Sequence, residues 1–96
     1  MFLIQLEFST NKPEAPRYME GHNAWLRRGF EDGIFLASGS LRTHQGGAVL
    51  AANTSLEALH EQVAQDPFVE HDVVRATIVE FGVAKAAPRL EFLVEQ

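Results

Sequence analysis

The stretch FLIQLEF at Phe2–Phe8 alternates between apolar and more polar positions along its whole length. Because successive side chains of a β-strand point to opposite faces, one face of this segment carries Phe2, Ile4, Leu6 and Phe8. The other face carries Leu3, Gln5 and Glu7. The alternation predicts a strand over residues 2–8 with one core face, and such a face has to be covered by helices.

A helical pattern follows after a turn-rich connection over residues 9–16. Apolar positions recur at spacings of three and four, which brings them to one helix face. They are Tyr18, Met19, His22, Trp25, Leu26, Gly29 and Phe30. Pro16 suits a first helical turn and Gly33 suits the left-handed residue that often follows a helix. We expect a helix from Pro16 to about Asp32.

The middle of the chain predicts two short strands and a second helix. We expect a strand over residues 34–38 that Gly39 interrupts, a hairpin or irregular segment over 41–45 leading to Gly46-Gly47, and a strand over 48–52. Thr54-Ser55-Leu56-Glu57 has the form of a capping box, with Thr54 as N-cap and Glu57 as its partner. Leu56, Leu59 and Val63 form the apolar stripe of this helix, and Asp66-Pro67 ends it.

Residues 72–81 are rich in β-branched side chains and predict the last strand. One face carries Val74, Ala76 and Ile78, and the other carries Val73, Arg75, Thr77 and Val79. The tail over residues 83–96 contains Pro88 and suggests a short edge strand or a segment lying on a neighbouring subunit. The order βαββαβ predicts a ferredoxin-like α+β fold, an antiparallel sheet with two helices on one face. We expect one domain over residues 1–96, with its core at about 1–82.

The sheet face without helices is mixed in character. It combines Leu3 and Val79 with Gln5 and Arg75, which is too apolar for free solvent and too polar for a sealed core. We therefore expect a homodimer that pairs sheet against sheet and encloses a cleft.

Composition excludes several classes of function. The 96-residue chain has 13 acidic and 8 basic side chains, a net charge of -5, which disfavours nucleic acid and anionic membranes as partners. It has no cysteine, no apolar run long enough to span a membrane and no basic segment before the apolar start, so we expect a cytoplasmic protein. We expect no cofactor, because the chain leaves no room for a cofactor domain and Gly46-Gly47 lacks the phosphate-loop pattern.

His22 is the leading candidate for chemistry, since it stands in an apolar stripe where Leu or Ala would be ordinary. Imidazole titrates near neutral pH, so a half-buried histidine with a fixed partner can move protons. Asp66 is the expected partner, because it follows the second helix where the two helices run side by side. The competing interpretation is a structural hydrogen bond for His22 and an ordinary turn residue for Asp66.

Other side chains give weaker signals. Arg42 could pair with an anionic substrate or form a surface salt bridge, and Trp25 and Phe68 could line an apolar pocket or pack in the core. Ser38 has no Gly-x-Ser-x-Gly setting, which argues against a serine nucleophile. The remaining histidines lack the spacing of metal ligands, so we expect no metal site. They are His44, His60 and His71.

Four elements together resemble the YCII-related proteins over residues 1 to about 82. They are His22-x-x-Trp25-Leu26 with Gly33, the turn Ala37-Ser38-Gly39-Ser40, the Gly-rich entry to the third strand, and Asp66-Pro67-Phe68. The resemblance implies a subunit of the dimeric α+β barrel group that dimerises through its sheet. It also implies a pocket around His22 and Asp66 that Ser38 helps to line. Ser40 stands where the family usually has proline.

Two functions follow as hypotheses. In the first, the chain is an enzyme in which His22 is the acid or base, Asp66 orients it and Ser38 donates a hydrogen bond to the substrate. The reaction would be an isomerase, lyase or dehydrochlorinase-like proton transfer on a small molecule, cyclic or aromatic, with anions among the candidates. In the second, the chain is a non-catalytic ligand-binding or interaction domain whose His–Asp pair is structural.

Overall fold

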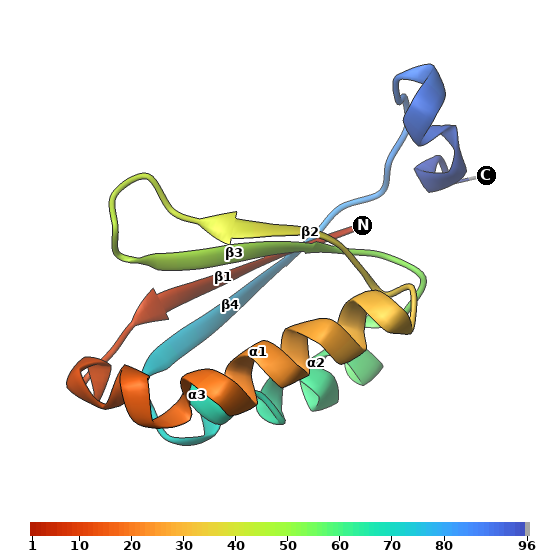
Figure 1. Cartoon of the computed structure of the whole chain (residues 1–96). Coiled ribbons are helices and arrows are strands. Elements are labelled where there is room, and N and C mark those ends of the chain that lie inside the picture. Colours follow the sequence, from red (N-terminus) through yellow and green to blue (C-terminus); the bar gives the residue numbers. More distant parts are fainter. Residues whose placement is uncertain (96) are drawn as a thin grey trace.

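The computed structural model describes residues 1–95 and contains four strands with helices between them (Figure 1). The strands are β1 (Phe2–Phe8), β2 (Phe35–Ser40), β3 (Gly46–Ala51) and β4 (Val74–Glu80). The α-helices are α1 (Ala15–Glu31), α2 (Leu56–Ala64) and the short α3 (Pro67–Glu70). Two 3-10 helices are η1 (Lys12–Glu14) and η2 (Pro88–Leu93).

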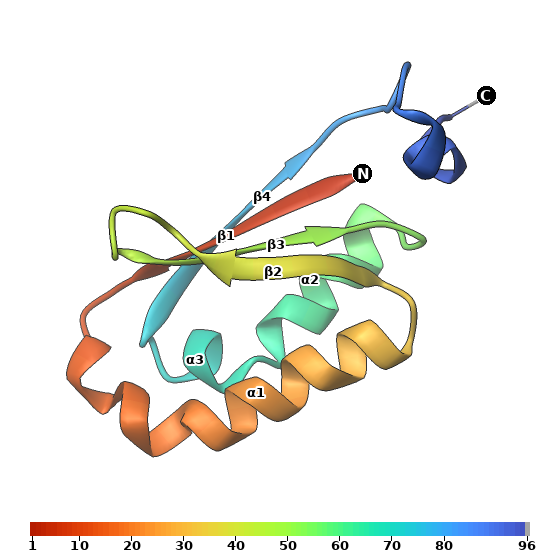
Figure 2. The same cartoon turned by 45° about the horizontal axis from the view of Figure 1, so that its top comes forward.

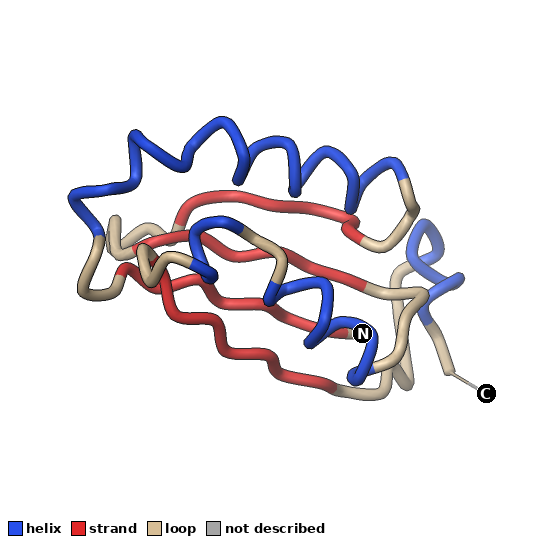
Figure 3. Tube along the Cα trace, turned by 90° about the horizontal axis from the view of Figure 1, so that it is seen from below, coloured by secondary structure: helices blue, strands red, loops and turns tan. Residues whose placement is uncertain are grey.

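The strands form one antiparallel sheet in the order β2-β3-β1-β4. All three α-helices lie on the same face of this sheet, with α1 running along its length and α2 and α3 following each other beside it (Figures 2 and 3). The predicted ferredoxin-like α+β fold is therefore confirmed. Among residues 1–95, no helix is long and apolar enough to cross a membrane.

The core lies between the sheet and the helices. The alternation predicted for β1 is confirmed, since Phe2, Ile4 and Leu6 are buried and face the helical layer. Val73 is a correction, because it is fully buried in the core instead of lying on the open sheet face. The physical reason is that Asp72 has a φ of 59°, which turns the chain before β4 begins at Val74.

The bounds of helix α1 are close to the prediction, but Met19 and Phe30 of its expected apolar stripe are exposed. Trp25 and Gly29 are its buried residues, and a Cβ on Gly29 would come within 2.0 Å of the ring of Phe35 in β2. Gly33 has a φ of 72° after the helix end, as expected for a left-handed terminating residue. The helix therefore approaches β2 as closely as a residue without a side chain allows.

The hairpin between β2 and β3 differs from the prediction at its glycines. Gly39 continues β2 instead of interrupting it, and Gly46-Gly47 lie inside β3, so the connection consists of residues 41–45. Gly46 has a φ of 139°, and a Cβ there would lie 1.9 Å from the carbonyl oxygen of Leu6. Gly46 thus permits close pairing with β1, and a Cβ on Gly47 would lie 3.0 Å from the carbonyl oxygen of Gly39 in β2, so the pair serves strand pairing and not the turn.

The cap of α2 is shifted by one residue from the prediction. Ser55, not Thr54, is the N-cap, and its hydroxyl accepts a hydrogen bond from the backbone nitrogen of Ala58 at 3.1 Å. The predicted capping box is therefore wrong, since Glu57 falls at the second helical position. The shift has a cause outside the helix: Asn53 has a φ of 62° and its amide donates to the carbonyl of Gly33.

The tail leaves the end of β4 and lies away from the helical layer (Figures 1 and 2). The expected edge strand is wrong within the described residues, because the tail forms η2. Its backbone folds back on itself through a hydrogen bond from the nitrogen of Glu95 to the oxygen of Val83. Leu90 and Phe92 of η2 are exposed.

Candidate active site

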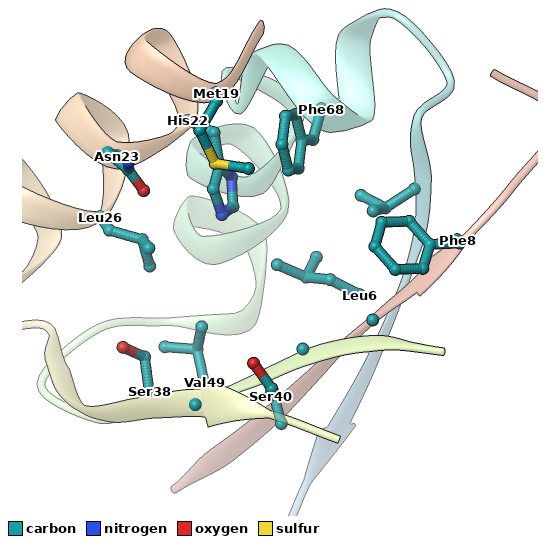
Figure 4. Close-up of a pocket in the computed structure, with 15 residues that line it drawn as sticks. Leu6, Phe8, Met19, His22, Asn23, Leu26, Ser38, Ser40, Val49 and Phe68 are labelled. Atoms are coloured by element: carbon teal, nitrogen blue, oxygen red, sulfur yellow. The ribbon is translucent and has the colours of Figure 1, made fainter. Parts of the chain in front are cut away.

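A pocket of about 300 Å³ opens between α1, α3 and the strands (Figure 4). Its apolar lining consists of Leu6, Phe8, Met19, Leu26, Val49, Phe68 and Val74. Its polar lining consists of His22, Asn23, Ser38 and Ser40, and its remaining wall is the small residues Gly39, Gly46, Gly47 and Ala48. A pocket of this size lies at the lower end of the range for small-molecule sites.

His22 and Asp66 form a hydrogen-bonded pair beside this pocket. Nδ1 of His22 lies 2.9 Å and 3.0 Å from the two carboxylate oxygens of Asp66. An ionised carboxylate only accepts hydrogen bonds, so Nδ1 is the donor, and in the neutral form of the ring Nε2 carries a lone pair. The Asp66 side chain is fully buried and that of His22 is 13% exposed. The pair thus has a shielded orienting partner and a ring with limited access to solvent.

The sequence Asp66-Pro67 explains why the carboxylate stands here. Asp66 does not merely end α2, which stops at Ala64; it is the extended N-cap of α3, and Pro67 occupies the first helical position. Its side chain accepts a hydrogen bond from the backbone nitrogen of Phe68 at 3.0 Å. Proline at the first turn sacrifices no hydrogen bond and fixes the entry to the helix. The helix that Asp66 starts is therefore the helix that aims its carboxylate at α1.

A close contact between α1 and α3 sets the separation of the pair. Gly21 precedes His22, and a Cβ there would come 2.9 Å from Cγ of Pro67, the residue that follows Asp66. The two residues that approach are thus direct neighbours of the two that pair. A side chain at position 21 would push α3, and with it Asp66, away from the histidine.

Two aromatic residues predicted to line the pocket have different places. Phe68 lines it and stacks on the imidazole of His22, with ring centroids 4.1 Å apart and an interplanar angle of 6°. Trp25 is a correction: it is 1% exposed, lies outside the pocket lining and belongs to the core. Its indole nitrogen donates to the carbonyl of Gln62 at 2.8 Å, and this bond satisfies its polar atom away from the pocket.

Of the two polar residues predicted to contact the substrate, only one lies at the pocket. Ser38 lines the pocket, whereas Arg42 lies exposed in the connection between β2 and β3 and contributes nothing to the lining. Two polar lining residues were not predicted as site residues, Ser40 and Asn23. Their spacing carried a signal, because Ser40 stands two residues beyond Ser38 on a strand and Asn23 stands four residues after Met19 on a helix. Within residues 1–95, no three potential metal ligands come together.

The fold and the pair define a small ferredoxin-like α+β domain with a His–Asp site beside an open pocket. The chain matches the YCII-related domain over residues 1–81 and belongs to that family, which confirms the resemblance seen in the sequence. No curated protein sequence matches it.

A solved structure with a similar fold is the 5-chloro-2-hydroxyhydroquinone dehydrochlorinase TftG from Burkholderia phenoliruptrix, in complex with 2,5-dihydroxybenzoquinone. The TM-score is 0.68 over 84% of this chain and 93% of that chain, at 13% sequence identity. At this identity the likeness concerns the fold.

Proposed function

We propose that this protein is a small-molecule enzyme in which His22 transfers protons and Asp66 orients its ring. The observation that carries the proposal is the pair itself, with Nδ1 held by a fully buried carboxylate and the histidine lining a pocket. An imidazole fixed at one nitrogen presents the other as a base of defined direction. The reaction class is an isomerisation or an elimination, including dehydrochlorination.

The chemistry balances without an outside oxidant. In an elimination, Nε2 of His22 takes a proton from a hydroxyl or C–H group of the substrate, and the leaving group departs with its bonding electron pair. A chlorinated substrate then loses one proton and one chloride in total. In an isomerisation the same nitrogen returns the proton to another atom. While His22 holds the proton, the carboxylate of Asp66 stabilises the imidazolium. A positioned acid or base such as His22 contributes about 10²- to 10⁴-fold in rate.

The surroundings of the ring support the same role. The parallel stack of Phe68 covers one face of the imidazole, so the ring cannot tilt freely. The hydroxyl of Ser38 stands on the sheet side of the pocket and is the proposed hydrogen-bond donor to the substrate (Figure 4). The similarity to a dehydrochlorinase favours the elimination among the possible reactions.

A second function competes with this one. Because the Asp66 carboxylate also caps α3, the pair could serve stability alone in a non-catalytic ligand-binding domain. In that case replacement of His22 would change stability or ligand affinity, and no reaction rate would depend on it.

We also propose that the protein is a cytoplasmic homodimer that pairs through the helix-free sheet face. Strand register places Val79, Leu3, Leu50 and Ala37 in one row across this face. Such an apolar row on a face that no helix covers is suited to a second copy of the chain.

The experiment uses 5-chloro-2-hydroxyhydroquinone as the probe and measures chloride release. In parallel, NMR in heavy water follows exchange of ring protons for deuterium. We expect His22→Gln to lower either rate by about 10²- to 10⁴-fold while the protein stays folded. The matched control is His60→Gln, which changes an exposed histidine on α2. Equal rates in both variants, or no reaction by the wild type in either assay, would overturn the proposal.

A further inference from the structure

The pocket has a polar wall that faces His22 from the sheet. Ser38 and Ser40 are two residues apart on β2, so their side chains share a face and stand roughly 6.6–6.8 Å apart along the strand. Figure 4 shows both hydroxyls on the sheet side of the pocket, with the ring of His22 above them and Asn23 extending from α1. Within residues 1–95, the side chains of Ser38, Ser40 and Asn23 form no hydrogen bond to another protein group. Their donors and acceptors are available to a ligand.

The same pocket has no fixed charge to offer an anion. Among residues 1–95, no Lys, Arg, Asp or Glu side chain lines it, and its histidine is already tied to the carboxylate of Asp66. Arg42 is exposed in the hairpin connection and Arg75 is exposed on β4, pairing in register with Glu7. A carboxylate or phosphate that entered would lose hydration without gaining a cation.

Size and lining restrict the ligand further. An apolar cavity of about 150 Å³ is enough to hold benzene, so a pocket of about 300 Å³ has room for one ring together with its substituents. Apolar side chains lie on both sides of this space, among them Leu26 and Val49. They suit the faces and edges of a ring, while the hydroxyls of β2 suit its oxygen substituents.

We infer that this pocket takes a single-ring molecule whose polar groups are hydroxyl or carbonyl oxygens and which carries no carboxylate, phosphate or sulfonate. Ser40 and Asn23 are the specificity-determining residues, because they supply neutral donors and acceptors where a site for acids would carry Arg or Lys. The inference rests on the proposed function only in taking this pocket as the substrate site.

A matched pair of probes tests it. Hydroquinone and 2,5-dihydroxybenzoate share the ring and both hydroxyls and differ by one carboxylate. Both are titrated under nitrogen into the full chain carrying His22→Gln, with dissociation constants from amide shifts in ¹H–¹⁵N spectra. We expect hydroquinone to shift amides of β2 and β3 at the pocket and to bind at least about tenfold more tightly than the carboxylate.

Variants show which residue sets this preference. Ser40→Ala should weaken hydroquinone binding several-fold. Ser40→Lys should reverse the order of the two probes, because the ammonium can pair with the carboxylate. Thr43→Lys is the matched control, since it adds the same charge in the exposed connection outside the pocket. It should leave the order unchanged.

Three results would overturn the inference: equal or tighter binding of the carboxylate by the His22→Gln chain without a lysine substitution, equal effects of the two lysine variants, or no binding of hydroquinone, catechol and resorcinol at millimolar concentration. Because this binding is measured in a His22→Gln background, it is independent of turnover. Failure of the catalytic proposal and failure of this inference are thus distinguishable.

Discussion

Asp66 holds His22 and the start of α3 with one carboxylate. Its Oδ1 atom lies 2.9 Å from Nδ1 of His22 and 3.0 Å from the backbone nitrogen of Phe68. Phe68 in turn stacks on the imidazole that Asp66 binds. The orientation of the ring and the position of its stacking partner therefore depend on a single buried side chain, so that a change at Asp66 acts on the pair and on folding together.

Stability should separate these two roles. Asp66→Ala removes the acceptor of a largely buried imidazole N–H, at a cost of about 1–3 kcal/mol, and removes a helix cap, at a cost of about 1 kcal/mol more. Asp66→Asn keeps an oxygen that can cap α3 and should cost less. Urea denaturation measures both. Ser55→Ala is the control, because it removes only the cap of α2. A free energy of unfolding lowered equally by Asp66→Ala and Ser55→Ala would contradict a stabilising His–Asp bond.

Turnover should respond differently from stability. In Asp66→Asn the amide nitrogen can donate to Nδ1, which moves the ring hydrogen to Nε2 and removes the base from the pocket. We expect a fall in kcat of about 10²- to 10⁴-fold, which rests on the proposed function. Nitrogen NMR of the imidazole measures the tautomer directly. Asp32→Asn, at the exposed end of α1, is the control and should change neither value. An unchanged tautomer together with unchanged kcat would contradict the orienting role of Asp66.

The sequence predicted those parts of the fold that depend on local periodicity. The alternation of β1 predicts which face is buried, and this prediction is confirmed. The stripe of α1 is confirmed at Trp25 and Gly29, whereas Met19 and Phe30 are exposed. The cap of α2 failed because Thr54 and Ser55 are equally good cap residues. The choice between them depends on the backbone turn at Asn53, which bonds to Gly33, twenty residues away in sequence. Local pattern contains no information on that contact.

The site was predictable to a similar extent. A histidine within an apolar stripe and an aspartate before a proline are visible in sequence, and the structure brings His22 and Asp66 into contact. The depth of Trp25 was not predictable, because its indole N–H finds the carbonyl of Gln62 only when α1 packs on α2. Ser40 was missed because Gly39 suggested that the strand ends before it.

The close approach of α1 and α3 gives a further prediction. Gly21→Ala replaces a helical glycine, a change that alone stabilises a helix by about 1 kcal/mol. Here the new Cβ would meet Cγ of Pro67 at 2.9 Å, so α3 has to shift and the His–Asp distance should lengthen. We expect kcat to fall about tenfold or more, because misplaced catalytic groups lose rate steeply.

A second substitution, Pro67→Ala, should restore activity to Gly21→Ala. Pro67→Ala removes the Cγ atom that the new methyl group meets, so the double variant should regain activity relative to Gly21→Ala. Activity that stays equally low in the double variant would mean that the contact with Pro67 does not position the pair. Denaturation of all three variants, analysed as a double-mutant cycle, separates this coupling from the helix propensity of alanine.

The helix-free sheet face gives the last prediction. If a second copy covers the row of Val79, Leu3 and Leu50, sedimentation should show a dimer, and Val79→Glu should convert it to a monomer, because the new carboxylate would be buried without a partner. Val79 is 46% exposed in the single chain, so the monomer itself tolerates this change. Leu56→Glu is the control, since it adds the same charge at an exposed leucine of α2 in the helical layer. It should leave the dimer intact. A monomeric wild type, or a Val79→Glu variant that remains a dimer, would show that this face is not the interface.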